Sequence, residues 1–297
     1  MRRIAFFCFA VLLPISGYAI NCTWDTVPTN INFGNYQPIS GGAVTGTSSF
    51  QFTCTPPATA TLMLSRGGSA TYNPRTMTRT AAPVSTANYN LFMDAANTII
   101  WGDGTSGTQY LTFVATPGNK TLAGTIYGTV PAGLNLRPGT YTDTIQATLD
   151  WGTGIDQRFF TVTVTVLSEC TVSSSTVNFG AYDPVSAHAA TPDDSTGTVN
   201  VYCTTGTLAT VSLDNGSHAS GAIRRLLGST GDFLTYELYN DSARSVVWNA
   251  VNTDSGTSVS KLTPINGGFT AYGRIFAGQD VGIGSYSDTV LVTVNYF

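Results

Sequence analysis

The stretch Phe159-Phe160-Thr161-Val162-Thr163-Val164-Thr165-Val166-Leu167 lies near the middle of the chain. Apolar and polar side chains alternate along it, so Phe160, Val162, Val164 and Val166 share one face and the threonines share the other. Because successive side chains of a strand point to opposite faces, the pattern predicts a β-strand with one buried face. The sequences before and after this strand resemble each other, but no equivalent strand follows the second copy.

The chain begins with a pattern typical of a secretory signal. Two arginines precede an apolar run from Ile4 to Leu13, and small residues lead up to Ala19. The alternative is a membrane anchor, which is disfavoured because the run is shorter than the roughly 20 residues that span a bilayer and Pro14 interrupts it. We therefore expect residues 1–19 to be removed and the rest to be exported.

Composition argues against several functional classes. The chain has 13 basic and 17 acidic residues without a basic patch, so nucleic acid is not an expected partner. No Gly-x-Ser-x-Gly, His-Glu-x-x-His or phosphate-binding loop occurs, and His188 and His218 show no ligand spacing. These observations predict a protein that is not an enzyme, with no cofactor and no metal site. Abundant Gly, Thr and Val favour an all-β fold.

Four cysteines remain after the predicted signal, and an even number in an exported chain indicates disulfides. Four cysteines allow three pairings. The almost equal spacings favour Cys22 with Cys54 and Cys170 with Cys203. Each bond would close a loop of about 30 residues, which contributes roughly 3–4 kcal/mol in the chain-entropy model. Metal binding is the weaker alternative because no two cysteines are close in sequence.

Two copies of one unit follow each other. Cys22 precedes Asn32-Phe33-Gly34-Asn35-Tyr36-Gln37-Pro38, and Cys170 precedes Asn178-Phe179-Gly180-Ala181-Tyr182-Asp183-Pro184. Later, residues 139–144 match residues 284–289. Many short strands separated by turn residues predict two tandem immunoglobulin-like β-sandwiches, with boundaries at 20–168 and 169–297.

These motifs resemble the spore coat protein U domain, a family that includes subunits of archaic chaperone–usher pili of Gram-negative bacteria. The second copy matches along its whole length, and the first matches mainly at its two ends. The resemblance implies pilin-type sandwiches that are completed by a strand from a neighbouring subunit. It also implies three partners: a periplasmic pilus chaperone, an outer-membrane usher and an adjacent pilus subunit.

The first copy is expected to complete itself and the second is not. A Gly-containing turn links the strand 145–151 to the Phe160 strand, which predicts a hairpin, whereas the second copy ends at Phe297. We expect an acceptor groove lined by Val290, Val292, Val294 and Tyr296. Burying the four apolar residues of the Phe160 strand is worth roughly 6–12 kcal/mol, comparable to the net stability of a domain. The alternative is that the last strand pairs internally.

The predicted mature chain would accept a strand but not donate one, because only Ile20 and Asn21 precede Cys22. Such a subunit belongs at the end of a filament. This resembles the two-domain tip adhesin of Csu-type archaic pili, and it implies secretion through the periplasm to a pilus tip on the cell surface. The expected role is attachment to an abiotic or host surface and biofilm formation.

The adhesive surface is expected at the end of the first domain that faces away from the second. A turn over residues 151–157 and, by the alternation of sandwich loops, residues 55–58 and 94–97 are assigned to this end. The candidate residues, each with ordinary loop packing as the alternative, are Pro56, Pro57, Ala95, Ala96, Trp151 and Ile155.

Two other functions remain open. A secreted carbohydrate-binding protein could stack sugar rings on Trp24 or Trp101, although Trp101 has a counterpart in Trp248, which favours core packing. A structural coat protein is the other alternative. Tyr141 and Asp143 recur as Tyr286 and Asp288, which indicates structural roles for both pairs.

Overall fold

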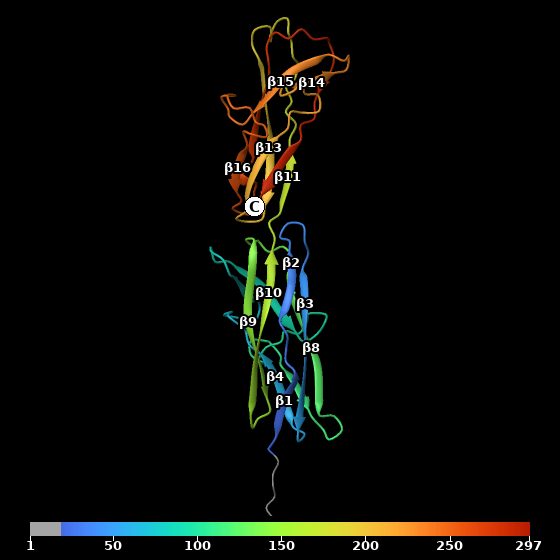
Figure 1. Cartoon of the computed structure of the whole chain (residues 1–297), viewed down its shortest axis with the longest axis vertical. Coiled ribbons are helices and arrows are strands. Elements are labelled where there is room, and N and C mark those ends of the chain that lie inside the picture. The colour runs from blue at the N-terminus through green and yellow to red at the C-terminus, as the bar shows by residue number, and fades with distance from the viewer. Residues whose placement is uncertain (1–18) are drawn as a thin grey trace, which may run out of the picture.

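The computed structural model describes residues 19–297, so all of the predicted signal peptide except Ala19 lies outside the described residues. The protein is all-β, and two sandwich domains lie end to end along one axis (Figure 1). Within the described range, no helix is long and apolar enough to cross a membrane.

The N-terminal domain is a two-layered sandwich. Its strands are β1 (Asn21–Thr26), β2 (Ile31–Tyr36), β3 (Val44–Thr55), β4 (Thr59–Leu64), β5 (Arg75–Arg79), β6 (Thr86–Phe92), β7 (Leu111–Val114), β8 (Thr121–Val130), β9 (Gly139–Asp150) and β10 (Ile155–Val166). The hydrogen-bonded order is β1-β3-β8-β6-β5-β9-β10-β2, with β4 between β7 and β9. The layers enclose one core that extends from Cys22 to Val166.

Strand β10 occupies the position that its alternating sequence predicts. Its apolar face is buried, with Phe160 at 2% and Val164 at 0% exposure. One edge is antiparallel to β9, where Phe160 lies opposite Ile145. The other edge is parallel to β2, where Val162 lies opposite Ile31. The strand therefore fills the space between the second strand, β2, and the penultimate strand, β9, of its own domain.

The C-terminal domain is a sandwich of the same kind, but residues 169–297 form no strand in the position that β10 occupies. Its elements are β11 (Cys170–Ser174), β12 (Asp193–Cys203), β13 (Leu208–Leu213), β14 (Arg224–Gly228), β15 (Phe233–Tyr239), β16 (Asp254–Thr257), η1 (Ile265–Gly267), β17 (Phe269–Ile275), β18 (Tyr286–Ser287) and β19 (Val292–Tyr296). One sheet has the order β11-β12-β17-β15-β14-β18, and the other has the order β16-β13-β19.

Each disulfide joins the first strand of its domain to the strand that pairs with it. Cys22 bonds to Cys54 between β1 and β3, and Cys170 bonds to Cys203 between β11 and β12. Each bond lies across directly paired residues of neighbouring antiparallel strands. The chain passes from β10 to β11 through residues 167–169 alone, so the domains are joined by a very short link.

Candidate functional site

The edge of β19 that faces away from β13 is open. Val292, Val294 and Tyr296 of β19 pair with Leu213, Val211 and Ala209 of β13. Over residues 19–297, no strand pairs with the opposite edge of β19. The equivalent strand of the N-terminal domain, β9, has β4 and β5 on one side and β10 on the other. The C-terminal domain therefore has a free edge where its counterpart has a paired strand.

Matched residues beside this edge differ in exposure. In β9, Ile145, Ala147 and Leu149 are all fully buried, whereas their counterparts Val290, Val292 and Val294 are half-buried. Tyr296, the counterpart of Trp151, is 42% exposed. Because the apolar sequence pattern is the same, the difference follows from the strand that covers one edge and not the other.

The segment on the opposite side of the groove shows the same contrast. In the N-terminal domain, Ile31, Phe33 and Tyr36 belong to β2 and are buried under β10. Their counterparts Val177, Phe179 and Tyr182 are half-buried, and residues 176–182 form no strand. The loss of regular structure is expected where a strand has no partner for its backbone groups.

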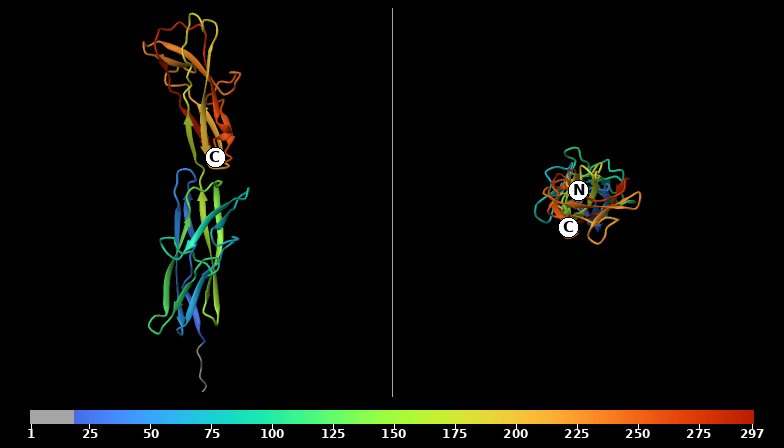
Figure 2. Two further views of the ribbon diagram at one scale, coloured as in Figure 1. Left: turned by 180° about the vertical axis from the view of Figure 1, so that it is seen from behind. Right: turned by 90° about the horizontal axis from the view of Figure 1, so that it is seen from above.

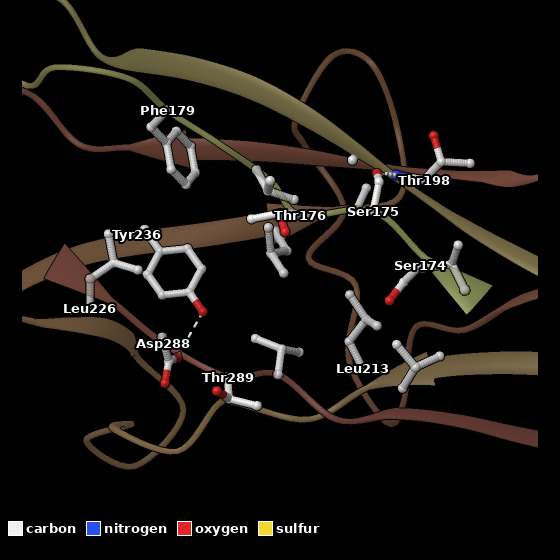
Figure 3. Close-up of a pocket in the computed structure, with 17 residues that line it drawn as sticks. Ser174, Ser175, Thr176, Phe179, Thr198, Leu213, Leu226, Tyr236, Asp288 and Thr289 are labelled. Atoms are coloured by element: carbon white, nitrogen blue, oxygen red, sulfur yellow. Dashed lines mark hydrogen bonds between the residues drawn. The ribbon is translucent and has the colours of Figure 1, made fainter. Parts of the chain in front are cut away.

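Two adjoining hollows mark the space between these segments, and we call them together the acceptor groove. Their volumes are about 280 and 800 Å³. Val177, Phe179 and Leu226 line both, and Val290 and Val292 line the smaller. Figure 3 shows Phe179 and Tyr236 facing Leu213 and Thr289 across the opening. Of the residues predicted for the groove, Val294 and Tyr296 lie beyond its lining.

Asp288 anchors the groove wall. Its carboxylate accepts a hydrogen bond from the Tyr236 hydroxyl at 2.8 Å, drawn in Figure 3, and lies 3.0 Å from Nδ1 of His218. Burial and this carboxylate raise the pKa of Tyr236 above its usual 10.0, so the hydroxyl remains a donor. Asp143 accepts from Tyr89 in the N-terminal domain at 2.6 Å. The recurrence gives both aspartates a structural role.

The end of the N-terminal domain that lies away from the C-terminal domain is called the pole. We define it as residues 19–21, 55–58, 115–120 and 151–154. Cys54 N–H donates to the Lys120 carbonyl at 3.0 Å, and Ala115 N–H donates to the Ala58 carbonyl at 2.9 Å. The Trp151 indole donates to the Ile20 carbonyl at 3.2 Å. Figures 1 and 2 show this end farthest from the C-terminal domain. Residues 115–120 were not assigned to it from the sequence.

The predicted adhesive residues divide between the pole and other places. Pro56 and Pro57 lie at the pole and are half-buried, and Trp151 is half-buried against the core. Ile155 is 59% exposed, but it is the first residue of β10 and not part of the turn, which closes between Trp151 and Gly154.

The placement of Ala95 and Ala96 at the pole is wrong. Phe92, at the end of β6, pairs with Tyr127 in the interior of β8. The turn that follows therefore projects from the side of the sandwich and does not reach the pole. Asp94 accepts from the backbone N–H groups of Thr98 and Ile99, and Asp241 closes the same turn in the C-terminal domain. The turn is a repeated feature of the fold.

Sequence reasoning missed two exposed apolar residues near the pole. Val114 is 63% exposed and Phe159 is 65% exposed. Thr59 pairs with Val114, and Thr61 pairs with Asp150, which in turn lies opposite Ile155. Val114 and Ile155 therefore lie on the outer face of the same sheet, at its pole end. The alternation of Leu111-Thr112-Phe113-Val114 was the available signal, because it places Val114 opposite the buried Phe113.

The two tryptophans considered for sugar stacking differ in burial. Trp101 is 2% exposed and donates from its indole to the Leu62 carbonyl at 3.0 Å. Trp24 is half-buried with its edge against Phe50 and Phe52. Trp101 therefore offers no free face for a sugar. Between residues 19 and 297, no group of three or more His, Cys, Asp or Glu side chains is placed to hold a metal ion.

Comparison with known proteins assigns the fold to a family. The sequence matches the Spore Coat Protein U domain twice, over residues 7–148 and 156–293. The chain belongs to this family. It is also 35% identical over 145 residues to Protein U of Myxococcus xanthus, covering 43% of this chain and 77% of that one. In keeping with its family, the chain is non-enzymatic.

One solved structure resembles both domains together. It comes from the complex of the chaperone CsuC and the tip adhesion subunit CsuE, from the archaic chaperone–usher Csu pili of Acinetobacter baumannii. The TM-score is 0.50 at 18% identity, and the match covers 92% of this chain and 99% of that one. The likeness shows a shared arrangement of two pilin-type β-domains.

Proposed function

We propose that this protein is the tip adhesin of a chaperone–usher pilus. The C-terminal domain joins the fibre by accepting a strand in the acceptor groove, and the N-terminal domain attaches the cell to surfaces and so promotes biofilm formation. The observation that supports this best is the open edge of β19 beside half-buried valines. The matched edge in the N-terminal domain is covered by β10.

The energetic case rests on the cost of an uncovered groove. Full burial of a Val or Phe side chain is worth about 1.5–3 kcal/mol, and an unpaired backbone edge favours strand addition. An incoming strand with apolar residues at alternate positions would bury Val290 and Val292 and pair with β19. Strand addition is a recurrent form of protein recognition. It requires an open strand edge for the main chain and pockets for alternate side chains.

The N-terminal domain supplies a template for the incoming strand. Strand β10 is antiparallel to β9 and parallel to β2, with Val162 opposite Asp143. We expect the donated strand to run antiparallel to β19 and parallel to residues 177–182. An apolar residue would lie opposite Asp288, the counterpart of Asp143.

The partners follow from the open groove. A periplasmic chaperone would cover it before assembly, an outer-membrane usher would pass the chain to the surface, and an adjacent subunit would then donate its strand. The resemblance to CsuE, which was crystallised with its chaperone, supports this order. The pole would then project outward at the end of the fibre.

The proposed contact surface joins Val114 and Ile155, at the pole end of the outer sheet face, to Pro56 and Pro57 of the pole. The test is to replace Val114 and Ile155 together by serine and to measure both the number of pili and attachment to polystyrene. Val84→Ser is the matched control, since Val84 is 75% exposed in the loop between β5 and β6. Attachment should fall sharply with piliation unchanged; equal attachment by both variants would refute the placement.

A polar hollow on the flank of the N-terminal domain favours carbohydrate binding as a second candidate function. Its volume is about 410 Å³, and its lining includes Arg66, Tyr72, Asn73 and Asp103. These groups can donate and accept hydrogen bonds with sugar hydroxyls. A glycan array probed with the full chain and with Asp103→Ala would detect such binding, and absence of any signal would exclude it for the sugars displayed.

A further inference from the structure

The two domains have ends built in the same way. In the N-terminal domain, the Tyr36 hydroxyl donates to the Pro131 carbonyl and accepts from Leu134 N–H, both at 2.9 Å. In the C-terminal domain, the Tyr182 hydroxyl donates to the Phe276 carbonyl at 2.9 Å and accepts from Gln279 N–H at 3.1 Å. Each tyrosine ties the loop that follows it to the loop before the penultimate strand.

In the N-terminal domain, the end that Tyr36 ties together contacts the C-terminal domain. We call the contacting part of the C-terminal domain, which includes Glu169 and Lys261, its base. The Glu169 carboxylate accepts hydrogen bonds from Ile39 N–H at 2.9 Å and from Ser40 N–H at 3.4 Å. The Lys261 ammonium donates to the Pro38 carbonyl at 2.7 Å and to the Gly133 carbonyl at 2.8 Å. Both loops tied by Tyr36 therefore take part in the junction.

The equivalent end of the C-terminal domain, which we call the far end, is bare. Val185, the counterpart of Ile39, is 88% exposed, and Ile283, the counterpart of Pro138, is 96% exposed. Ile39 and Pro138 are half-buried. Val185 and Ile283 line the same hollow of about 800 Å³. Two exposed apolar side chains therefore lie on loops whose counterparts in the N-terminal domain contact the next domain.

The far end differs from the N-terminal junction in its charge. Asp183 replaces Gln37, and its carboxylate accepts from the N–H groups of Val185 and Ser186, both at 3.0 Å. These are the counterparts of the groups that Glu169 binds at the internal junction. Asp280 also replaces Asn135. A carboxylate from a neighbour would find these donors occupied and would face two negative charges.

We propose that the far end of the C-terminal domain is the docking surface for the base of the adjacent subunit's first domain. This inference rests on the proposed function, because the neighbour arrives with its donated strand. The larger hollow of the acceptor groove extends to Val185 and Ile283 at the far end. It shares Val177, Phe179 and Asp288 with the smaller hollow, so the strand and the base bind one continuous surface. Val185 and Ile283 make the contact, and a neutral or basic residue of the neighbour takes the place that Glu169 has at the internal junction.

Site-specific photocrosslinking in the cells that produce the pilus tests the proposal. The crosslinking amino acid p-benzoylphenylalanine replaces Val185 or Ile283 in the full chain. Val251, which is 87% exposed in the loop between β15 and β16, is the matched control, and Val292 in the groove reports on strand donation. After irradiation of isolated pili, mass spectrometry identifies the crosslinked peptides.

If the far end is the docking surface, positions 185 and 283 should crosslink to residues near the first cysteine of the adjacent subunit. The crosslinking yield should be several-fold above that of position 251. Crosslinks from position 292 alone would overturn the docking surface while leaving strand donation intact. No crosslink from any of these positions, including 292, would reject strand donation itself, and the docking surface with it. A yield at position 251 equal to that at 185 and 283 would also overturn the docking surface.

Discussion

Arg75 is a fully buried arginine that the sequence did not reveal. Its guanidinium donates to the Ser65 carbonyl, to Oδ1 of Asn90 at 2.8 Å and to the Trp101 carbonyl at 2.6 Å. Burial is the main cause that lowers the pKa of Arg75. Arg224 makes matching bonds to Asp214 and Trp248, so the arrangement belongs to the fold. A strand arginine ordinarily faces solvent, and no pattern in the sequence marks this exception.

Replacing Arg75 should destabilise the N-terminal domain. Arg75→Leu leaves the carbonyls of Ser65 and Trp101 without a donor, and we expect the free energy of unfolding to fall by about 3–5 kcal/mol. The measurement is urea unfolding followed by tryptophan fluorescence. Arg66→Leu, at an exposed position, should change the free energy of unfolding by less than about 0.5 kcal/mol. Similar effects for the two variants would contradict the account.

The junction between the domains depends on the charge of Glu169. Burial alone would raise the pKa of Glu169, but hydrogen bonds from Ser40, Ile39 and Gln37 outweigh it and lower the pKa below the usual 4.5. A carboxylate with a lowered pKa stabilises the folded contact above its ordinary pKa. That contribution is lost as the pH falls below 4.5 and passes through the lowered value.

The domains should therefore move independently in acid. Small-angle X-ray scattering should show a rigid extended particle at neutral pH and a broader range of shapes near about pH 3, below the usual carboxylate range. Glu169→Ala should show the broader range at neutral pH, and Ser168→Ala should not. A scattering profile that is independent of pH would show that Glu169 does not hold the junction.

At the scale of elements, β10 was predictable and its second partner was not. Strict alternation gives the strand and its buried face directly, and the Gly-containing turn gives its pairing with β9. The parallel pairing of Val162 with Ile31 joins segments far apart in sequence, and it depends on the path of the whole chain. The same dependence explains the misplaced turn at Ala95 and the overlooked residues 115–120.

The two faces of β10 should respond very differently to a charge. Val164 is fully buried, so Val164→Asp places an unpaired carboxylate in the core and should cost more than about 4 kcal/mol, enough to unfold the N-terminal domain. Thr163→Asp lies on the outer face and should leave the domain folded. Circular dichroism during thermal unfolding makes the comparison. A folded Val164→Asp variant would show that β10 does not complete this domain.

At the scale of the whole molecule, the repeat explains both what the sequence could predict and where it failed. Matched motifs predicted two domains, a hollow beside Val290 and Val292, and a first domain that β10 completes. The exposure of Val185 and Ile283 could not be predicted from the sequence. A single apolar residue in a loop has no periodic pattern that shows which way its side chain faces. The molecule places exposed Val114 and Ile155 near one end and exposed Val185 and Ile283 at the other, with the two sandwiches between them.

The central claim is that the C-terminal domain lacks one strand. The direct measurement is calorimetry of residues 20–297 with a copy of residues 158–167 fused after Phe297 through a flexible Gly/Ser linker. The control carries serine at the four positions copied from Phe160, Val162, Val164 and Val166. We predict that the apolar strand alone raises the melting temperature of the C-terminal domain and makes its transition cooperative. Equal transitions for the fused, control and unfused chains would show that the groove needs no strand and would contradict the account.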